Sequence, residues 1–519
     1  MKIERTANAR RNIIYGMILR IYQIVLPFFM RSLIVYTLGV QYLGLNSLFT
    51  SVLQVLNLAE LGVGSALVFS MYKPIVEDDT EKIRALVNLH RTYYRMIGLV
   101  VLVAGLAVTP FIPKLIKGTV PPGINLYALY LISLASTVLT YWAFAYRSSV
   151  LQAHQRLDVI TRVTIITDTV RYALQIVMLL CFRNYYCYMS AVLVTQLMTN
   201  IITAAASKRL YPKYSPAGKL SKAEVREING RFRDLFTAKF GSTVVNSADT
   251  IVISSFLGLT ALAVYQNYYY IMTAVISFIG ILLNSCTAGI GNSLVVESRE
   301  KNYRDFRKIA FLVVWISGVC VCCFLTVYQP VMDLWMGPEN MLGFGCVILL
   351  CLYFYLYTTN NFMCIYKDAA GMWHEDRFRP LVAALTNLTL NLILVRYIGI
   401  FAIILSTVIS YTLVTMPWLI RNLFSVVFRT DKKDFVRQFL KGTLCVCIAA
   451  GVCYLICRFL PPTGIITIIL RIVISVTVSN LLFILLLRKD ALFGEAMDLV
   501  DRLTGFRFTK IISLIKIGG

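Results

Sequence analysis

Long apolar runs follow one another along almost the whole chain, and they constrain the fold more than any other feature of the sequence. Each run holds about 20 mostly apolar residues, enough for a helix to cross a hydrocarbon layer roughly 30 Å thick. Lipid offers no hydrogen-bond partner to an open backbone group, so each crossing is expected to be helical. With 58% hydrophobic and only 15% charged residues among 519, the composition excludes a soluble globular enzyme. We therefore expect an all-α integral membrane protein.

Fourteen apolar segments are long enough to be drawn as transmembrane helices. The first is too long, and too interrupted by arginine, to be the core of a signal peptide. The predicted spans are 12–38, 44–71, 96–116, 124–146, 159–182, 184–205, 236–257, 261–294, 309–332, 341–366, 380–398, 399–420, 442–460 and 464–487.

The 50 Lys and Arg residues sort almost entirely to one side of this drawing. We place the N-terminus in the cytoplasm because four basic residues precede the first span, and basic residues concentrate in cytoplasmic segments. The bias predicts an even number of crossings in the cell membrane, with both termini cytoplasmic, and we interpret the net charge of +24 as topology rather than nucleic-acid binding. Only five basic residues fall in the outside loops, namely Lys114, Lys117, Arg183, Arg396 and Arg458.

The longest polar stretch, 206–235, divides six spans from eight. We interpret it as a cytoplasmic linker between an N-terminal six-helix lobe, 1–205, and a C-terminal six-helix lobe, 236–425. Residues 439–488 then form an added helix pair. The tail, 489–519, alternates apolar and basic residues, which is typical of an interfacial helix.

The two predicted lobes begin with similar sequences. Gly39 aligns with Gly258 at an offset of 219 residues, and residues 62–67 resemble 289–294 at an offset of 227. Paired six-helix halves with a site between them are a known transporter plan. This similarity favours two pseudo-symmetric lobes, although short apolar segments that contain glycine also match by chance.

Two arginines lie within the first predicted span. A charged side chain at this depth is costly, so it usually faces a cavity or a partner. Arg20 and Arg31 flank Pro27, which bends a helix, and their separation of about three turns places both on one face. This arrangement suits an anionic group that moves along the helix. The simpler alternative for Arg20 is that its side chain extends to the cytoplasmic interface.

Three further charges are predicted inside the membrane in the first lobe. Glu60 lies in the second span, where it is placed to neutralise either arginine of the first. Asp168 and Arg171 are three residues apart in the fifth span, a spacing that allows an ion pair on one helix face. That pair has a structural and a functional interpretation, and the sequence leaves both open.

The second lobe supplies an anion and two amides. Asp249 lies one position from Arg31 at the 219-residue offset, and Asn246 lies one turn before it. Asn361 lies at depth on the tenth span, where it either faces a cavity or bonds across helices. We predict Arg31, Arg20, Asn246 and Asn361 as substrate-binding residues, with Asp249, Glu60, Asp168 and Arg171 as coupling or charge partners.

Aromatic, histidine and cysteine residues carry weaker signals. Tyrosines cluster at 265–270 and 353–357, a pattern typical of interfacial belts and also of surfaces on which sugar rings stack. The 13 cysteines lie within or beside apolar spans and are interpreted as small buried hydrophobes. We expect no metal site. The three histidines are placed in cytoplasmic loops, with the last two solvated: His90, His154 and His374.

Two stretches resemble a known family. Residues 39–73, GVQYLGLNSLFTSVLQVLNLAELGVGSALVFSMYK, and 246–268, NSADTIVISSFLGLTALAVYQNY, are similar to the polysaccharide exporters often called Wzx-type flippases. These belong to the multidrug/oligosaccharidyl-lipid/polysaccharide exporter superfamily, with the lipid II flippases and the multidrug and toxin exporters. The resemblance implies two six-helix lobes around a central cavity and fourteen helices as in lipid II flippases, whereas drug exporters typically have twelve.

The resemblance also implies a cargo and a mechanism. The cargo is a polyprenyl-diphosphate-linked oligosaccharide, moved from the cytoplasmic to the outer leaflet by alternating access for polysaccharide biosynthesis. Basic cavity residues hold the diphosphate in such transporters, and Arg31 with Arg20 is the match here. We expect no cofactor, a membrane potential or ion gradient as the driving force, and contacts with membrane lipids and with a polymerase or glycosyltransferases of the same pathway.

Three alternatives remain at this stage. A lipid II-type peptidoglycan precursor flippase shares the fold and the chemistry. A multidrug exporter needs acidic cavity groups for cationic drugs, which the arginines of the first span disfavour. A membrane glycosyltransferase or ligase needs catalytic groups on sizeable outer loops, where only Asp333 and Glu339 are acidic. Because we find no nucleotide loop, carboxylate pair or triad, we expect a transporter rather than an enzyme.

Overall fold

The computed structural model describes residues 5–60, 62–461 and 464–504. Side chains are described for these residues except 5–10, 13, 59, 233–235, 237–242, 244–246, 288, 491 and 503–504. All regular secondary structure in the described ranges is helical, which confirms the predicted all-α class. The chain divides into two compact units, Met1–Ala263 and Val264–Gly519. The predicted lobe, linker and tail boundaries stay predictions.

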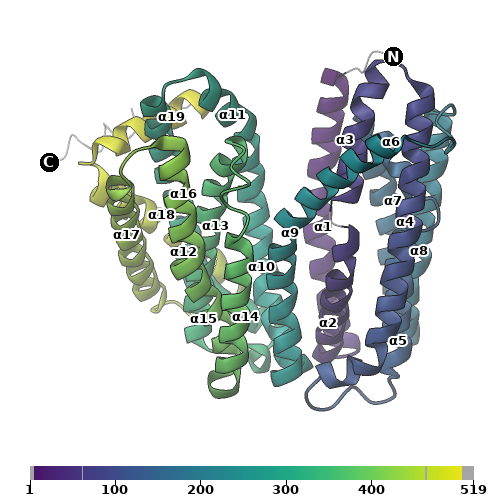
Figure 1. Cartoon of the computed structure of the whole chain (residues 1–519). Helices are drawn as coiled ribbons and strands as arrows, with labels where there is room; N and C mark the ends of the chain where they lie inside the picture. The colour runs from purple at the N-terminus through teal and green to yellow at the C-terminus, as the bar shows by residue number, and fades with distance from the viewer. Residues whose placement is uncertain (1–4, 61, 462–463, 505–519) are drawn as a thin grey trace. The chain divides into compact units, whose positions relative to one another are not determined.

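The first unit is built from long helices joined by short turns (Figure 1). α1 continues through Pro27 without interruption and packs against α7, which in turn packs against α8, while α2 packs against α9. The helices of this unit are α1 (Arg5–Thr37), α2 (Val40–Leu56), α3 (Val63–Val76), α4 (Thr80–Val108), α5 (Leu126–Leu139), α6 (Ser148–Ala153), α7 (Leu157–Val177), α8 (Tyr185–Leu210) and α9 (Lys222–Leu257).

The second unit is organised around α12, which contacts α13, α17, α18 and α19. Phe306 on α12 is fully buried and meets the rings of Phe362, Phe428 and Phe435 at centroid distances of 4.8–5.4 Å. The helices here are α10 (Leu259–Ser285), whose first residues belong to the first unit, α11 (Thr287–Val296), α12 (Arg299–Met336), α13 (Phe344–Ala369), α14 (Arg379–Ile398), α15 (Ile400–Ile409), α16 (Met416–Asn422), α17 (Lys433–Cys457), α18 (Ile465–Leu487) and α19 (Ala491–Thr504).

Eleven helices in the described residues are long and apolar enough to cross a membrane. There are also three shorter apolar helices: Val63–Val76 overlaps the predicted span 44–71, and Leu126–Leu139 and Ser247–Leu257 lie within the predicted spans 124–146 and 236–257. The protein is therefore a multi-pass membrane protein. The count of fourteen crossings stays a prediction.

The second predicted span, 44–71, is not one helix. α2 ends at Leu56, a short 3₁₀ turn covers Asn57–Glu60, and α3 begins after Gly62. Gly62 has φ of 98°, a conformation that glycine adopts without steric cost. The eighth predicted span is likewise divided between α10 and α11. Helix breaks at membrane depth are tolerated where protein or a cavity satisfies the freed backbone groups.

The starts of α2 and α10 are built alike. Gly39 and Gly258 precede these helices with φ of 113° and 92° and extended ψ values of 162° and 177°. This shared backbone geometry supports the 219-residue register of the predicted repeat. The two starts also lie close together, because a Cβ on Gly44 of α2 would overlap the carbonyl of Leu259.

The stretch 206–235, predicted as a linker, is mostly helical. α8 extends to Leu210, and α9 starts at Lys222 with a capping box between Ser221 and Glu224. The intervening residues are anchored to α4, where Asn88 Nδ2 donates to the carbonyl of Gly218 at 2.9 Å. Lys82 adds an ion pair with Glu224 at 2.6 Å. The connection is therefore a short strap held against the first unit.

Two histidine interpretations were wrong. His90 lies within α4 rather than in a loop, because α4 begins at Thr80, and it is 1% exposed with the Tyr94 ring 4.1 Å from its own. His154 is not solvated: it is 4% exposed, with its ring centroid 4.0 Å from that of Tyr211, and burial lowers its pKa. Tyr211 lies on the strap, so the strap covers His154 and buries it.

The start of the predicted tail docks on α12. Leu492, Phe493 and Ala496 are buried, and Lys308 pairs with Glu495 at 3.2 Å. The rest of the tail, 505–519, lies outside the described residues.

Candidate functional site

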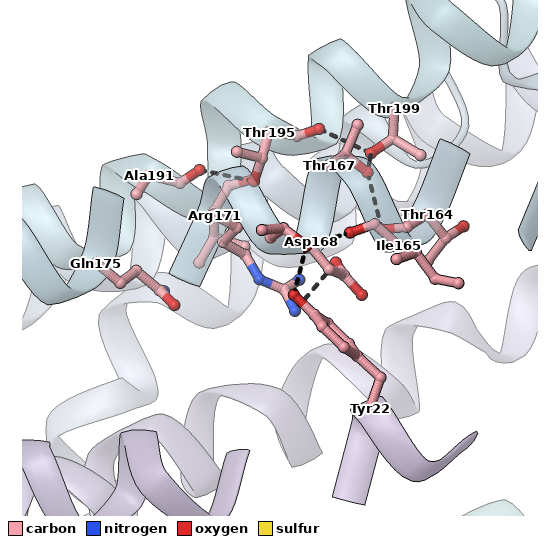
Figure 2. Close-up of polar contacts among 12 residues, drawn as sticks. Tyr22, Thr164, Ile165, Thr167, Asp168, Arg171, Gln175, Ala191, Thr195 and Thr199 are labelled. Carbon is pink, nitrogen blue, oxygen red and sulfur yellow. Dashed lines mark hydrogen bonds and ion pairs between the residues drawn. The ribbon is translucent and has the colours of Figure 1, made fainter. Parts of the chain in front are cut away.

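The predicted ion pair on α7 forms. Arg171 Nη2 lies 3.1 Å from Asp168 Oδ1, and the two side chains are 27% and 13% exposed. Figure 2 shows the guanidinium of Arg171 turned toward Asp168 and toward Tyr22 of α1. The three-residue spacing on a helix is sufficient for this contact. The sequence therefore predicted this pair correctly.

α1 is attached to this pair through aromatic and hydroxyl groups. The hydroxyls of Tyr22 and Thr169 share a hydrogen bond of 2.7 Å, and the rings of Tyr22 and Tyr172 lie 6.1 Å apart. The guanidinium of Arg171 also lies over the Tyr172 ring, 4.7 Å from its centroid, within the range of a cation–π contact. Arg171 is thus held by a carboxylate on one side and a ring on another.

Arg31 reaches the same region through Tyr188 of α8. The guanidinium groups of Arg31 and Arg171 both lie close enough to the Tyr188 phenol to interact with it electrostatically. Arg31 is half-buried and Tyr188 is 8% exposed. The cation predicted from α1 and the ion pair predicted from α7 therefore belong to one cluster.

A row of tyrosines continues from this point. Tyr188 stacks on Tyr185 at 5.5 Å with the rings nearly parallel, and Tyr185 meets Tyr42 of α2 at 4.9 Å. The hydroxyl of Tyr185 donates to the carbonyl of Tyr42 at 3.3 Å. Aromatic faces of this kind accept the C–H edges of sugar rings.

The α7–α8 contact beneath the cluster is polar. Thr199 Oγ1 donates to Thr167 Oγ1 at 2.8 Å (Figure 2). Gln175 Nε2 donates to the Tyr188 carbonyl at 3.4 Å. Oε1 of Gln175 is buried and has no hydrogen-bond partner among the described residues. A buried acceptor without a donor is uncommon, and this one lies beside Tyr188. The backbone of Tyr188 is therefore fixed by α7.

Taken together, these residues form what we call the α1–α7–α8 site: Tyr22, Arg31, Asp168, Arg171, Tyr172, Gln175, Tyr185 and Tyr188. The site holds two arginines and one carboxylate among apolar helices. Arginine presents a planar fork of donors that matches phosphate oxygens. The site combines these donors with aromatic surface, so its chemistry suits a phosphorylated and glycosylated group. The described residues contain no group of three or more His, Cys, Asp or Glu side chains placed to hold a metal ion.

Two other predicted residues of the first unit lie elsewhere. Arg20 is exposed on α1. Glu60, in the break between α2 and α3, accepts a hydrogen bond from the Tyr94 hydroxyl of α4 at 3.4 Å. Close by, the Tyr141 hydroxyl donates to Asn57 Oδ1 at 3.0 Å. Glu60 is thus part of a second polar cluster built around the helix break.

The residues predicted on spans seven and ten belong to different units of the fold. Asp249 is 8% exposed on α9, in the first unit, and the side chain of Asn246 lies outside the described residues. Asn361 is half-buried on α13, beside Asn360, which is 7% exposed and donates to Cys364 Sγ at 3.7 Å. Their roles in substrate binding or coupling stay predictions.

The tyrosines of the second unit do not form an interfacial belt. Tyr265 and Tyr353 are 5% and 6% exposed, and Tyr269 stacks on Tyr353 at 6.4 Å. Tyr411 joins Tyr353 at 5.5 Å. The rings pack on one another within the unit, so the belt interpretation was wrong.

Tyr188, Tyr185 and Gln175 were missed by the sequence reasoning. Gln175, one turn beyond Arg171, is a polar residue within an apolar span, and that signal was available. The tyrosines carried no such signal, because residues 185–188 lie at the start of a span, where tyrosine is common.

The family is established by a sequence comparison. The model of a family described as polysaccharide biosynthesis protein matches residues 9–285. The chain belongs to this family. The match covers all of the α1–α7–α8 site. No curated protein sequence matches the chain.

Solved structures establish the fold. Lipid II flippase MurJ, in an inward closed conformation, superimposes with a TM-score of 0.68 at 15% identity, covering 92% of this chain and 99% of that chain. An inward-facing multidrug resistance MATE family transporter of the MOP superfamily gives 0.61 at 15% identity, covering 80% and 99%. A MATE transporter from Vibrio cholerae gives 0.54 at 13% identity, covering 82% and 99%. The fold is therefore that of MurJ and the MATE transporters.

Proposed function

We propose that this protein is a flippase that moves a polyprenyl-diphosphate-linked oligosaccharide from the cytoplasmic to the outer leaflet for polysaccharide biosynthesis. The observation that carries the proposal is the Arg171 guanidinium, which Asp168 holds at 3.1 Å and the Tyr172 ring at 4.7 Å among apolar helices. Arg31 of α1 acts electrostatically on the same neighbour, Tyr188. Membership of the polysaccharide biosynthesis family and the similarity of the fold to a lipid II flippase support it. Transport, rather than catalysis, is the activity that these findings favour.

In this proposal the two arginines bind the diphosphate. Arg171 is oriented by Asp168 and the Tyr172 ring, so its guanidinium loses little freedom when an anion binds. Arg31 lies on the neighbouring helix and supplies the second cation. Tyr42, which is half-buried at the end of the tyrosine row, offers its ring to the sugars, while the polyprenyl tail stays in lipid. Arg20, on the same helix as Arg31, is the first contact on the cytoplasmic side.

The finer architecture is part of the same proposal. An even number of crossings and cytoplasmic termini are supported by the distribution of Lys and Arg. The fourteen crossings come from the apolar spans, and two six-helix lobes that alternate in access come from the internal repeat and from the transporter plan of paired halves. An ion gradient or the membrane potential drives turnover, since moving one charge through 100 mV is worth about 2.3 kcal/mol. Glu60 and Asp249 are the acids that we assign to coupling, with Asn246 and Asn361 as further cargo contacts. A polymerase and glycosyltransferases of the same pathway act before and after this step.

A lipid II-type precursor is the alternative cargo. It shares the polyprenyl diphosphate, and the solved structure of MurJ shares the fold. The family match favours polysaccharide biosynthesis. A multidrug exporter is disfavoured because it needs acidic groups that bind cationic drugs, whereas the α1–α7–α8 site contains two arginines.

Replacement of Arg31 tests the proposal. We expect Arg31→Gln to abolish transport, because the diphosphate loses one of its two cations, while the protein still inserts in the membrane. Arg209→Gln, an exposed arginine at the end of α8, is the matched control and is expected to transport normally. The measurement is the amount of lipid-linked intermediate that accumulates in the inner leaflet of cells that express each variant. Undiminished export by Arg31→Gln would show that the cargo assignment is wrong.

A further inference from the structure

A second basic and aromatic cavity lies on the first unit, away from α1. It has a volume of about 490 Å³ and lies between α4 and the segment that follows α5. Two arginines and four rings line it: Arg91, Arg95, Tyr141, Trp142, Phe144 and Tyr146. None of the lining residues is a carboxylate. We call it the α4–α5 pocket.

The two arginines are one helical turn apart on α4 and face the same side. Within the described part of the chain, neither makes an ion pair, and Nε of Arg91 is buried without a hydrogen-bond partner. Arg95 is exposed. Buried donors are almost always paired, so an unpaired guanidinium nitrogen at a cavity indicates an acceptor that binds there. The charge of the pocket calls for an anion.

The far wall of the pocket has an unusual backbone. Ala143 and Phe144 are consecutive residues with φ of 51° and 69°, in the left-handed region that residues other than glycine rarely adopt. Such conformations persist where the surrounding structure fixes them, and they cluster at binding sites. Here they place the ring of Phe144 in the open, where it is 57% exposed.

Trp142 fixes this wall to α4. Its indole nitrogen donates to the carbonyl of Arg95 at 3.3 Å. The ring packs directly on Gly98, where an added Cβ would overlap the indole. The aromatic wall is therefore held at a set distance from both arginines.

An exposed apolar stripe begins next to the arginines and continues along α4. Its members recur at helical spacing and are each about half exposed, namely Met96, Leu99, Val100, Val103 and Leu106. In a membrane protein such a stripe faces acyl chains. The pocket thus lies at the boundary between a basic segment and a lipid-facing helix face.

We propose that the α4–α5 pocket binds the phosphate headgroup of an anionic phospholipid, with its acyl chains along the apolar stripe of α4. Basic pockets between helices at the cytoplasmic side of a membrane are suited to anionic headgroups, and arginine pairs with phosphate through two parallel hydrogen bonds. In this proposal the rings of Trp142 and Phe144 contact the glycerol backbone, since aromatic side chains are enriched at membrane interfaces. This site involves none of the residues of the α1–α7–α8 site, so it stands independently of the proposed cargo.

The test is lipid binding by the full-length protein in nanodiscs. We expect native mass spectrometry to show phosphatidylglycerol retained over phosphatidylcholine, and Arg91→Gln/Arg95→Gln to lower the affinity for phosphatidylglycerol about tenfold. Arg209→Gln is the control and is expected to retain the lipid. Equal retention of both lipids by the unmodified protein, or unchanged retention by the double variant, would overturn the proposal.

Two further arms complete the experiment. Inorganic phosphate and glycerol phosphate are titrated against the protein in detergent, and we expect neither to compete with phosphatidylglycerol. Full competition by inorganic phosphate would overturn the lipid assignment in favour of a soluble anion. If the double variant does not fold, the single variant Arg95→Glu is tested in its place, because the Arg95 side chain is exposed and its replacement is not expected to disturb the fold. We expect the same loss of retention from that variant, and unchanged retention would again overturn the proposal.

Discussion

Replacing the ion pair between Asp168 and Arg171 distinguishes a structural role of these residues from a role in transport. At 3.1 Å, two unit charges attract by about 5 kcal/mol with an effective dielectric constant near 20. Desolvation removes much of this, and the measured cost of breaking a pair is about 3–5 kcal/mol when buried but about 0–1 kcal/mol when exposed. The two side chains are 27% and 13% exposed, so they lie between these limits.

We therefore expect Asp168→Asn and Arg171→Gln each to lower the free energy of unfolding by about 1–3 kcal/mol. The double variant leaves no uncompensated charge, so its loss is expected to be smaller than the sum of the two single losses. Reversible unfolding in mixed micelles measures all four proteins. This part of the experiment reports only the structural role of the pair.

Transport by the same four proteins reports the functional role. Asp168→Asn keeps the cation, so we expect it to move cargo. Arg171→Gln and the double variant lack the cation, so both are expected to lose transport, even though the double variant recovers stability. Transport by the double variant at the rate of the unmodified protein would refute the reasoning, because Arg171 would then serve only to neutralise Asp168.

Three further predictions follow from close contacts and from a carboxylate on the strap. Gly44→Val places carbon atoms against the Leu259 carbonyl, so we expect it to lower the thermal midpoint, at a cost of about 1–3 kcal/mol. Gly280→Ala is the control, because no atom lies within 4 Å of the new Cβ, and it is expected to leave the midpoint unchanged. Equal midpoints for the two variants would contradict this prediction. Arg379→Met breaks the bidentate pair of Arg379 with Asp376, whose two hydrogen bonds measure 2.7 and 2.8 Å and whose side chains are 9% and 3% exposed. We expect the free energy of unfolding to fall by about 3–5 kcal/mol. A fall below about 1 kcal/mol would count against a tight buried pair. Hydrogen bonds from Lys82 and Ser221 lower the pKa of Glu224 to about 2 from 4.5, so the strap's attachment is complete above about pH 4.5 and is lost as the pH falls toward 2. The amide protection factors of residues 211–221, which compare exchange with the intrinsic rate at each pH, should fall over that range in the unmodified protein and be low throughout in Glu224→Gln.

Most of the helices could be predicted because the bilayer leaves a chain few choices. Each apolar run of sufficient length must satisfy its own backbone hydrogen bonds, so spans such as 309–332 and 380–398 fall inside α12 and α14. The Asp168–Arg171 pair was also predictable, because its geometry depends only on the pitch of one helix. Local physics is sufficient for features of this kind.

The helix break at Asn57–Gly62 was missed because hydropathy averages over it. Two polar residues and two glycines within the span, Asn57, Glu60, Gly62 and Gly64, were the available signal. The buried histidines were missed for another reason: α4 starts ten residues before His90, earlier than the predicted span, and Tyr211 of the strap packs on His154. Contacts of this kind depend on segments far apart in the chain.

The convergence of Arg31 and Arg171 also lay beyond the sequence. The two residues lie on α1 and α7, and the group that brings them together, Tyr188, lies on α8. The pattern of each span indicated a charge at depth, but no pattern indicated which charges share a neighbour. Helix packing decides that.

The mass of the lipid that co-purifies with the protein tests the central claim most directly. The protein is purified under mild conditions from a cell that makes the lipid-linked intermediate, alongside Arg31→Gln prepared in the same way. We predict a bound species whose fragments show a polyprenyl chain, a diphosphate and several sugars, present with the unmodified protein and depleted in the variant. A bound species without a diphosphate, or equal amounts of the diphosphate lipid in both preparations, would contradict the account.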